Sequence, residues 1–366
     1  WRRRAARSHR RRRPRWRAYK NSEFIFVKAN IFVRYLDKFI YWIAKNIFKK
    51  QNTISYRYIL QRLCFLNKVS KNLNRNDYDK VILENHSSLF LALKWRKNYY
   101  KYAGKYYYHV HNEIKQGYGC DDIIKNSKSI LCVSDYIRKQ VKEILNIDGN
   151  ILTVLKNGID TAKFNGTIDE KTAKDLRNKY KIKHDEKVII FTGRINEQKG
   201  IKQLLQAISN MNYSKFKLLV VGGYFFNTNI KSNFEKEIEP LIEKVKDNVI
   251  FTGYVDYEEL HNIYAISDIA VLPSMWEEPC ALTVIESMAS GLPIIATDSG
   301  GIPEYVNENM SVIIKRDKYL VKNLRIAIDE LISNDEKIKE MSKEAKKQAR
   351  LFSKSEYYKN FMDRIK

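Results

Sequence analysis

Four charged residues in the second half of the chain have the types and spacing needed to hold a phosphorylated sugar. Glu278 and Glu286 stand at the two ends of the apolar run in "EEPCALTVIESMA", and Arg194 and Lys199 bracket the loop of "TGRINEQKG". Two cations on one loop can close on a diphosphate, with Arg as a planar fork and Lys as a point charge. A carboxylate can accept both hydrogen bonds of a sugar diol. Spacing alone leaves the alternative of ordinary surface charges open.

The segments around these residues predict the sheet that must position them. Apolar strand-like runs alternate with helix-like runs, at 187–194, 201–210, 216–223, 231–246, 248–255, 257–267 and 268–274. Such alternation is typical of a parallel sheet with helices on its faces, in which ligands bind at the carboxyl ends of the strands. A short helix at 282–289 should end at Gly291, and its first backbone N–H groups, at Leu282 and Thr283, should face a phosphate.

The first half of the chain predicts a second, related domain. Strands are expected at 79–85, 105–113, 129–135 and 150–158, with a helix at 136–145. The fold class is therefore α/β with two Rossmann-like domains. We divide the chain into an Arg-rich head, an N-terminal domain, a linker, a C-terminal ligand-binding domain and a final helix, at 1–20, 21–165, 166–186, 187–348 and 349–366.

The block from Glu278 to Glu286, continued by "SMASGLPIIATDSGGIPEYV", resembles the signature of family 4 retaining glycosyltransferases of the GT-B fold. The segments "GRINEQKG", "LLVVGG", "FTGYV" and "YAISDIAVLPS" follow the same family order. The resemblance implies two domains facing a central cleft, with the C-terminal helix crossing back to the N-domain. It implies transfer of a hexose from a nucleotide-diphosphate sugar to a glycan or lipid-linked acceptor, in bacterial cell-surface polysaccharide synthesis.

The resemblance also implies a role for each matching residue. Arg194 and Lys199 would bind the diphosphate, Glu278 would contact the donor sugar, and Glu286 would bind the ribose. The other implied contacts are Gly193 in the phosphate loop, the backbone near Leu282 and Thr283, the turn of Gly253, Tyr254 and Val255 beside the base, and His111 of "HVHNE" facing the sugar.

His111 is open to a second interpretation, because a structural role in a Tyr-rich strand fits it as well. His109, two residues earlier, would point the same way in a strand. The resemblance implies no metal and no cofactor beyond the donor, a UDP- or GDP-sugar. The "DYD" at 77–79 has the form of a metal-binding D-x-D, but we interpret Asp79 as the start of a strand.

The N-terminal region departs from the family pattern. A strand, a Gly-rich loop and a helix should open the N-domain, and we recognise none before residue 79, so we interpret that domain as incomplete. The first 20 residues hold ten Arg, Lys20 and no acid, which indicates a non-native head or a polyanion-binding arm. Without those eleven charges the formal net charge falls from +25 to +14.

Three further expectations concern surroundings and partners. The helix expected at 30–50 is amphipathic and basic, so it either packs on its own domain, which we favour, or lies on an anionic membrane. No run of apolar residues is long enough to span a membrane, and the four scattered Cys fit a reducing compartment. We therefore expect a cytoplasmic location, with peripheral binding to the inner face of the membrane as the alternative. The alternative functions are a polyanion or nucleic-acid binder, for which no specific motif exists, and a GT-B epimerase.

Overall fold

The computed structural model describes residues 23, 25–49, 53–147, 149–223 and 233–366. The chain divides into a helical unit, Trp1–Asp79 with Leu89–Tyr102, and a two-sheet unit, Lys80–Ser88 with Ala103–Lys366. The Arg-rich head lies outside the described residues. None of the four cysteines, all of which lie in the described ranges, forms a disulfide. Among the described helices, we find none with both the length and the apolar character that crossing a membrane requires.

Short and long helices make up the helical unit. They are α2 (Ile31–Asn46), a 3-10 turn (Thr53–Tyr58), α3 (Ile59–Arg75), α4 (Phe90–Lys94), a second turn (Trp95–Lys97) and α5 (Asn98–Lys101). The buried amide of Asn98 donates to the carbonyls of Ser70 and Ala92, at 2.9 and 3.1 Å. This amide therefore ties α3 to α4.

Helix α2 confirms the helix expected at 30–50, and it packs on its own unit as we favoured, although much of its apolar side stays exposed. The side facing its own unit carries Asp37 and Ala44, which are buried. The apolar residues Phe32 and Phe39 are 67% and 57% exposed. The helix is held through a polar contact, because the Asp37 carboxylate accepts from the first N–H groups of α3.

The first sheet of the two-sheet unit is parallel, with the order β1-β2-β3-β4. Its strands match the four expected segments: β1 (Val81–Glu84), β2 (Tyr106–Val110), β3 (Ser129–Cys132) and β4 (Leu152–Val154). A 3-10 turn (Ser87–Leu89), α6 (Asp121–Lys125), α7 (Asp135–Leu145) and a turn (Gly149–Ile151) connect them. The final helix α15 (Lys354–Arg364) packs on this sheet, where Tyr107 donates to the carbonyl of Ile365 at 3.0 Å. The predicted return of the C-terminal helix is confirmed.

The second sheet has six parallel strands in the order β10-β9-β8-β5-β6-β7. The strands are β5 (Lys187–Thr192), β6 (Phe216–Val221), β7 (Val249–Gly253), β8 (Ile269–Leu272), β9 (Ile294–Thr297) and β10 (Ser311–Ile314). The chain runs outward from β5 through β7 and then returns to place β8 on the other side of β5. The order in which the chain adds strands to the sheet therefore reverses between β5 and β8. Such a point is called a topological switch point, and α/β sheets bind their ligands there.

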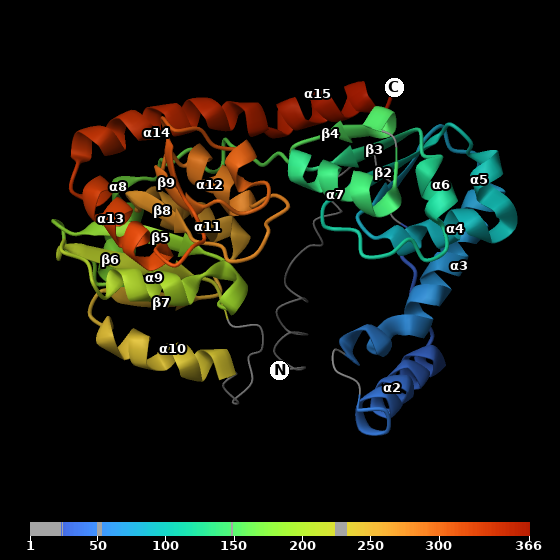
Figure 1. Ribbon diagram of the computed structural model, residues 1–366, viewed down its shortest axis with the longest axis horizontal. Helices are drawn as coiled ribbons and strands as arrows, with labels where there is room; N and C mark the ends of the chain where they lie inside the picture. Colours follow the sequence, from blue (N-terminus) through green and yellow to red (C-terminus); the bar gives the residue numbers. More distant parts are fainter. Residues whose placement is uncertain (1–22, 24, 50–52, 148, 224–232) are drawn as a thin grey trace. The chain divides into compact units, whose positions relative to one another are not determined.

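Helices cover both faces of the second sheet (Figure 1). Alternate side chains of β5 enter the two cores: Val188 and Ile190 one, Ile189 and Phe191 the other. The helices are α8 (Glu170–Lys179), α9 (Ile201–Ile208), α10 (Asn233–Lys244), α11 (Tyr257–Ala265), α12 (Leu282–Ala289), α13 (Leu320–Ile332) and α14 (Asp335–Ala349), with 3-10 turns at Glu197–Lys199, Ile302–Glu304 and Arg350–Phe352.

The segment 166–186, which we predicted as a linker, contains helix α8. Two residues that follow the helix, Tyr180 and Ile182, are 8% and 6% exposed and belong to the core of the second sheet. This segment therefore packs as part of the C-terminal domain, and Ile168, Ala173 and Leu176 lie against the same core.

Candidate active site

Two loops meet at the switch point between β5 and β8. The Met275 N–H donates to the carbonyl oxygen of Gln198 at 2.8 Å, and the Ser274 hydroxyl oxygen lies 3.1 Å from the same carbonyl oxygen. Gly200 adopts a φ of +71°, and a Cβ there would lie 1.8 Å from the carbonyl oxygen of Pro273. Only glycine fits that backbone and that contact. The loop carrying Lys199 is therefore held firmly against the loop that leads to Glu278.

Lys199 and Glu278 form an ion pair at this junction, with Nζ 2.5 Å from Oε1. The Glu278 side chain is 9% exposed and the Lys199 side chain 24%. Ser274 adds a hydrogen bond to the same carboxylate oxygen at 2.8 Å. A partly buried carboxylate with two donors is held in one orientation, and the cation beside it stays available to an anion.

Arg194 occupies the other end of the same loop and is exposed. It follows Gly193, whose carbonyl oxygen would lie 1.8 Å from a Cβ at Gly222. The loops after β5 and β6 therefore approach each other at main-chain distance. The structure brings Lys199 to Glu278, and it leaves Arg194 on the exposed side of the loop.

Helix α12 has the bounds predicted for it, and it carries Glu286 on its buried side. Tyr264 donates to the Glu286 carboxylate at 3.1 Å, and the Tyr264 hydroxyl also lies 2.7 Å from Oγ1 of Thr192. Burial raises the pKa of Glu286 to about 7, against a smaller lowering by the Tyr264 hydrogen bond. Glu286 therefore changes charge in the physiological range.

The N-terminus of α12 has no side-chain cap, because Ala281 stands at the capping position. Leu282 is 47% exposed, and Thr283 is partly exposed. An uncapped helix start presents backbone N–H groups and the positive end of the helix dipole, which suits a phosphate. The predicted phosphate cradle is thus structurally available.

The turn after β7 carries the three residues that the resemblance places beside the base. Gly253 has a φ of +70°, and Tyr254 is 79% exposed. Val255 instead packs against the core of the second sheet. The turn therefore exposes the Tyr254 ring, while Val255 fixes the turn to the core.

The turn of Gly300 and Gly301 completes the wall behind Glu278. The Gly301 N–H donates to the carbonyl of Glu278 at 2.7 Å, and the Gly300 N–H donates to the Glu277 carboxylate at 2.6 Å. Arg316 forms an ion pair with the same Glu277 carboxylate. The two neighbouring carboxylates therefore have different partners. Glu277 binds the Gly300 N–H and Arg316, whereas Glu278 binds Lys199.

His111, the candidate from the N-terminal domain, belongs to a cluster with Glu84 and His109. Glu84 Oε2 lies 2.9 Å from Nε2 of His111 and 3.1 Å from Nδ1 of His109. Burial raises the pKa of Glu84, but hydrogen bonds to both histidines lower it to about 2. His109 is buried and His111 is 32% exposed, which separates the two histidines that the sequence left interchangeable.

These three side chains are also of the types that bind metal ions. Within the described residues, their ligand atoms form a group lying within 4.8 Å of one another. Two imidazoles and one carboxylate could hold a divalent ion. The cluster can therefore act either as a hydrogen-bonded support for His111 or as a metal site, and chelation separates the two.

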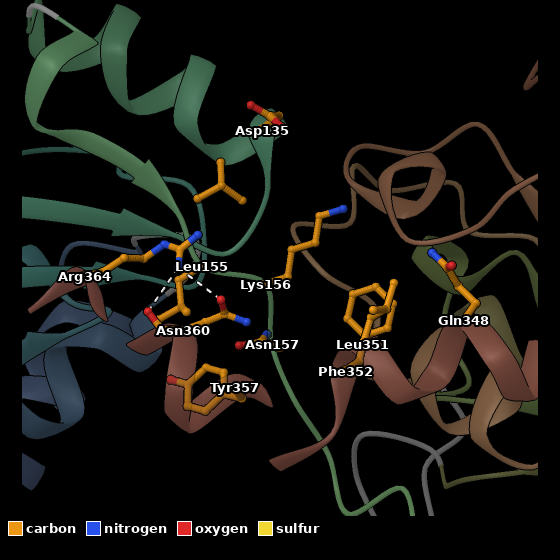
Figure 2. Close-up of a pocket in the computed structure, with 11 residues that line it drawn as sticks. Asp135, Leu155, Lys156, Asn157, Gln348, Leu351, Phe352, Tyr357, Asn360 and Arg364 are labelled. Atoms are coloured by element: carbon orange, nitrogen blue, oxygen red, sulfur yellow. Dashed lines mark hydrogen bonds between the residues drawn. The ribbon is translucent and has the colours of Figure 1, made fainter. Parts of the chain in front are cut away.

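A cavity of about 390 Å³ lies between β4 and the α14–α15 connection (Figure 2). Lys156 and Arg364 line it, together with Asn157 and Asn360. Arg364 is tied to the Asn360 carbonyl at 3.0 Å. Because Ile159 N–H also donates to the Phe352 carbonyl at 2.9 Å, this cavity marks the place where the chain crosses between the two sheets.

A contact joins the two sheets close to the candidate site. The Glu304 carboxylate accepts from the backbone N–H groups of Asp135 and Tyr136, at 2.6 and 2.7 Å, and so caps α7. The Tyr305 hydroxyl donates to the carbonyl of Val133 at 2.7 Å. The segment that follows the Gly-Gly turn therefore holds the C-terminal domain against the first sheet.

Sequence reasoning missed Ser274, Tyr264 and the partner role of Glu84. Ser274 closes the "LPS" at a predicted strand end, so its place at the ligand edge was a usable signal. Tyr264 lies inside a helix, and Glu84 lies at the end of a strand. No local pattern distinguishes either residue, since both act on partners more than 20 positions away in the chain.

The two parallel sheets, with the terminal helix that returns to the first of them and the switch-point site in the second, are those of the GT-B fold. The Anabaena protein HepE, solved in complex with UDP, superposes with a TM-score of 0.69 at 16% identity, covering 84% of this chain and 88% of that one. At this identity the likeness shows the fold alone.

Residues 172–348 match the family Glycosyl transferases group 1, so the chain contains a glycosyltransferase domain of this family. Spore coat protein SA of Bacillus subtilis is 28% identical over 66% of this chain and 66% of its own length. The lipopolysaccharide 1,2-N-acetylglucosaminetransferase of Salmonella typhimurium is 25% identical over 74% of this chain and 67% of its own length. The chain thus spans about two thirds of the length of these relatives. The resemblance to group 1 glycosyltransferases is confirmed, and retention of configuration stays a prediction.

Proposed function

We propose that this chain transfers a hexose, with retention of configuration, from a UDP- or GDP-sugar to a glycan or lipid-linked acceptor. The observation that carries the proposal is the Lys199–Glu278 pair at the switch point of the second sheet, beside the uncapped start of α12. The family match and the lipopolysaccharide transferase among the relatives support a role in cell-surface polysaccharide assembly. We propose a cytoplasmic location, where nucleotide sugars would be supplied.

Each site residue has one role in this proposal. The diphosphate lies on the N–H groups of Leu282 and Thr283, with Lys199 and Arg194 offsetting its charge. The ribose hydroxyls donate to Glu286. Glu278, released from Lys199 when the diphosphate takes that cation, accepts from the hydroxyls of the donor sugar.

The reaction then needs little from the protein beyond charge and position. The bond from the acceptor oxygen to the anomeric carbon forms as the bond from that carbon to the diphosphate oxygen breaks. The acceptor proton passes to the departing diphosphate. Negative charge grows on the leaving oxygens, so fixed cations at Arg194 and Lys199 lower the barrier. His111, supported by Glu84, faces the donor sugar from the N-terminal domain.

The first prediction is that a nucleotide sugar stabilises the folded protein. At a concentration 100 times its dissociation constant, a ligand adds about 2.7 kcal/mol to the free energy of unfolding. In a thermal-shift screen of UDP-, GDP- and ADP-sugars, the melting temperature should therefore rise with the sugars of one base. Stabilisation by duplex DNA or heparin, without any response to nucleotide sugars, would support the polyanion-binding alternative instead.

The second prediction concerns metal. Because Lys199, Arg194 and the start of α12 supply positive charge, we propose that no metal is needed, and treatment with EDTA should leave turnover unchanged. Loss of turnover on chelation, restored by added Zn²⁺ or Mn²⁺ in the unaltered chain but not in Glu84→Gln, would assign Glu84, His109 and His111 as metal ligands. Asp79→Asn, at an exposed acid near the same strand, is the matched control.

A further inference from the structure

The helical unit presents an unusual amount of apolar surface. Half of the exposed large apolar side chains in the described residues lie between Ile25 and Phe65. The most exposed of these on α2 are Ile31, Phe32, Tyr35, Phe39 and Trp42, at 69%, 67%, 62%, 57% and 52%. We call these five side chains the α2 apolar face. Scattered apolar residues need no explanation, but a contiguous patch of this kind marks an interaction site.

The direction of this face is set by a polar anchor on the opposite side of the helix. The carboxylate of Asp37, which is buried, accepts from the backbone N–H groups of Leu60 and Gln61, at 2.8 and 3.0 Å. It therefore caps the start of α3 and holds α2 by that side. Rotating α2 to bury its apolar face within this unit would break both bonds and leave the N–H groups of Leu60 and Gln61 without this acceptor.

Basic residues flank the apolar face. Arg34, Lys38 and Lys45 are exposed, and the Lys38 ammonium lies 4.9 Å from the centre of the Tyr35 ring. Between Ile25 and Phe65 the sequence holds eight Lys and Arg residues and one acid, the buried Asp37. The surface around the patch is therefore strongly positive.

We propose that α2 docks the protein flat on an anionic phospholipid surface. Three observations favour this occupant over a protein partner. The charge is complementary to acidic headgroups, and the apolar face includes Trp42 and Tyr35, residue types that favour the headgroup boundary. Its 16 residues make a rod about 24 Å long that can lie along the interface with Arg34, Lys38 and Lys45 at the headgroups.

This proposal does not depend on glycosyl transfer, and binding can be measured without it. The test is sedimentation of the full chain with phosphatidylcholine vesicles that do or do not contain 30% phosphatidylglycerol, at low and high salt. We expect binding to the anionic vesicles at low salt and its loss at high salt. Arg34→Gln/Lys38→Gln/Lys45→Gln should weaken it on the order of 100-fold, since each cation contributes about a fivefold factor.

A second variant, Phe32→Ser/Phe39→Ser/Trp42→Ser, removes three of the aromatic side chains of the α2 apolar face. It should abolish binding to the vesicles although the Arg-rich head is intact. The matched controls are exposed residues elsewhere, Tyr319→Ser/Tyr358→Ser for the rings and Lys322→Gln/Lys339→Gln/Lys343→Gln for the charges, and they should bind normally. Circular dichroism and melting confirm that each variant is folded.

Four results would overturn the proposal. They are no binding of the unaltered chain to anionic vesicles, equal binding to neutral vesicles, binding that survives the α2 substitutions, and a dimer that the apolar substitutions convert to a monomer. The last would show that a second copy covers this face.

Discussion

Replacing Lys199 by Ala should reduce glycosyl transfer by about 10²–10³-fold. The Lys199 ammonium lies at the switch point, 2.5 Å from Glu278, where negative charge grows on the leaving diphosphate. Loss of one such preorganised donor costs roughly 2.7–4 kcal/mol of transition-state stabilisation. The rate of nucleoside diphosphate release, measured at saturating donor, should therefore fall while the fold is kept.

The control for this experiment is Lys202→Ala. Lys202 lies three residues further along and pairs with Glu237, away from Glu278. Because Lys199→Ala also leaves the Glu278 carboxylate without its cation, the melting temperatures of both variants must be compared. Normal transfer by a folded Lys199→Ala protein would show that this lysine does not serve the leaving group.

Replacing Glu286 by Gln should weaken the binding of free nucleoside diphosphate and remove a pH dependence. The pKa of Glu286 is raised to about 7, chiefly by burial, and the ribose hydroxyls should prefer the ionised form. If only that form binds, affinity falls by roughly tenfold from pH 8 to pH 6. Calorimetric titration at both values should show this loss in the unaltered chain but not in Glu286→Gln, after the ligand's own titration is subtracted.

The same substitution should stabilise the folded protein at high pH. The folded-state pKa of Glu286 lies above its usual value of 4.5, so its contribution favours folding below pH 4.5 and is lost as the pH rises through about 7. At about 1.36 kcal/mol per pKa unit, Glu286→Gln should raise the free energy of unfolding at pH 8 by up to roughly 3 kcal/mol. The gain should vanish near pH 4.5. Denaturant unfolding at the two pH values measures both effects.

Glu278→Gln is the comparison that separates the two acids. Glu278 faces Lys199 and not Tyr264, so its loss should spare nucleoside diphosphate binding and damage turnover of the whole donor. An equal loss of nucleotide binding in both variants would refute the division between a sugar acid and a ribose acid.

Local patterns predicted the elements that carry the site. The apolar face of 282–289 and the stop at Gly291 predicted α12 with its observed bounds. The two strands before Arg194 and Tyr254 were also predicted, with ends two residues beyond the observed ones, because buried parallel strands are continuous apolar runs bounded by glycine.

Local sequence patterns could not predict which side chains from distant segments meet. Glu278 meets Lys199 because β8 lies beside β5, and strand order is not written in any local pattern. The cluster of Glu84 with His109 depends on the register between β1 and β2. The outward face of α2 depends on the Asp37 contact with α3, which outweighs the periodicity that suggested a buried face.

The measurement that tests the central claim most directly is nuclear magnetic resonance of the full chain with the nucleotide sugar that stabilises it. With an acceptor, or with water in its place, we expect release of nucleoside diphosphate and a first-formed product that keeps the anomeric configuration of the donor. Both signals should fall by about 10²–10³-fold in Lys199→Ala. An inverted product, an epimerised sugar, or an intact donor beside a folded and nucleotide-bound protein would contradict a retaining transferase.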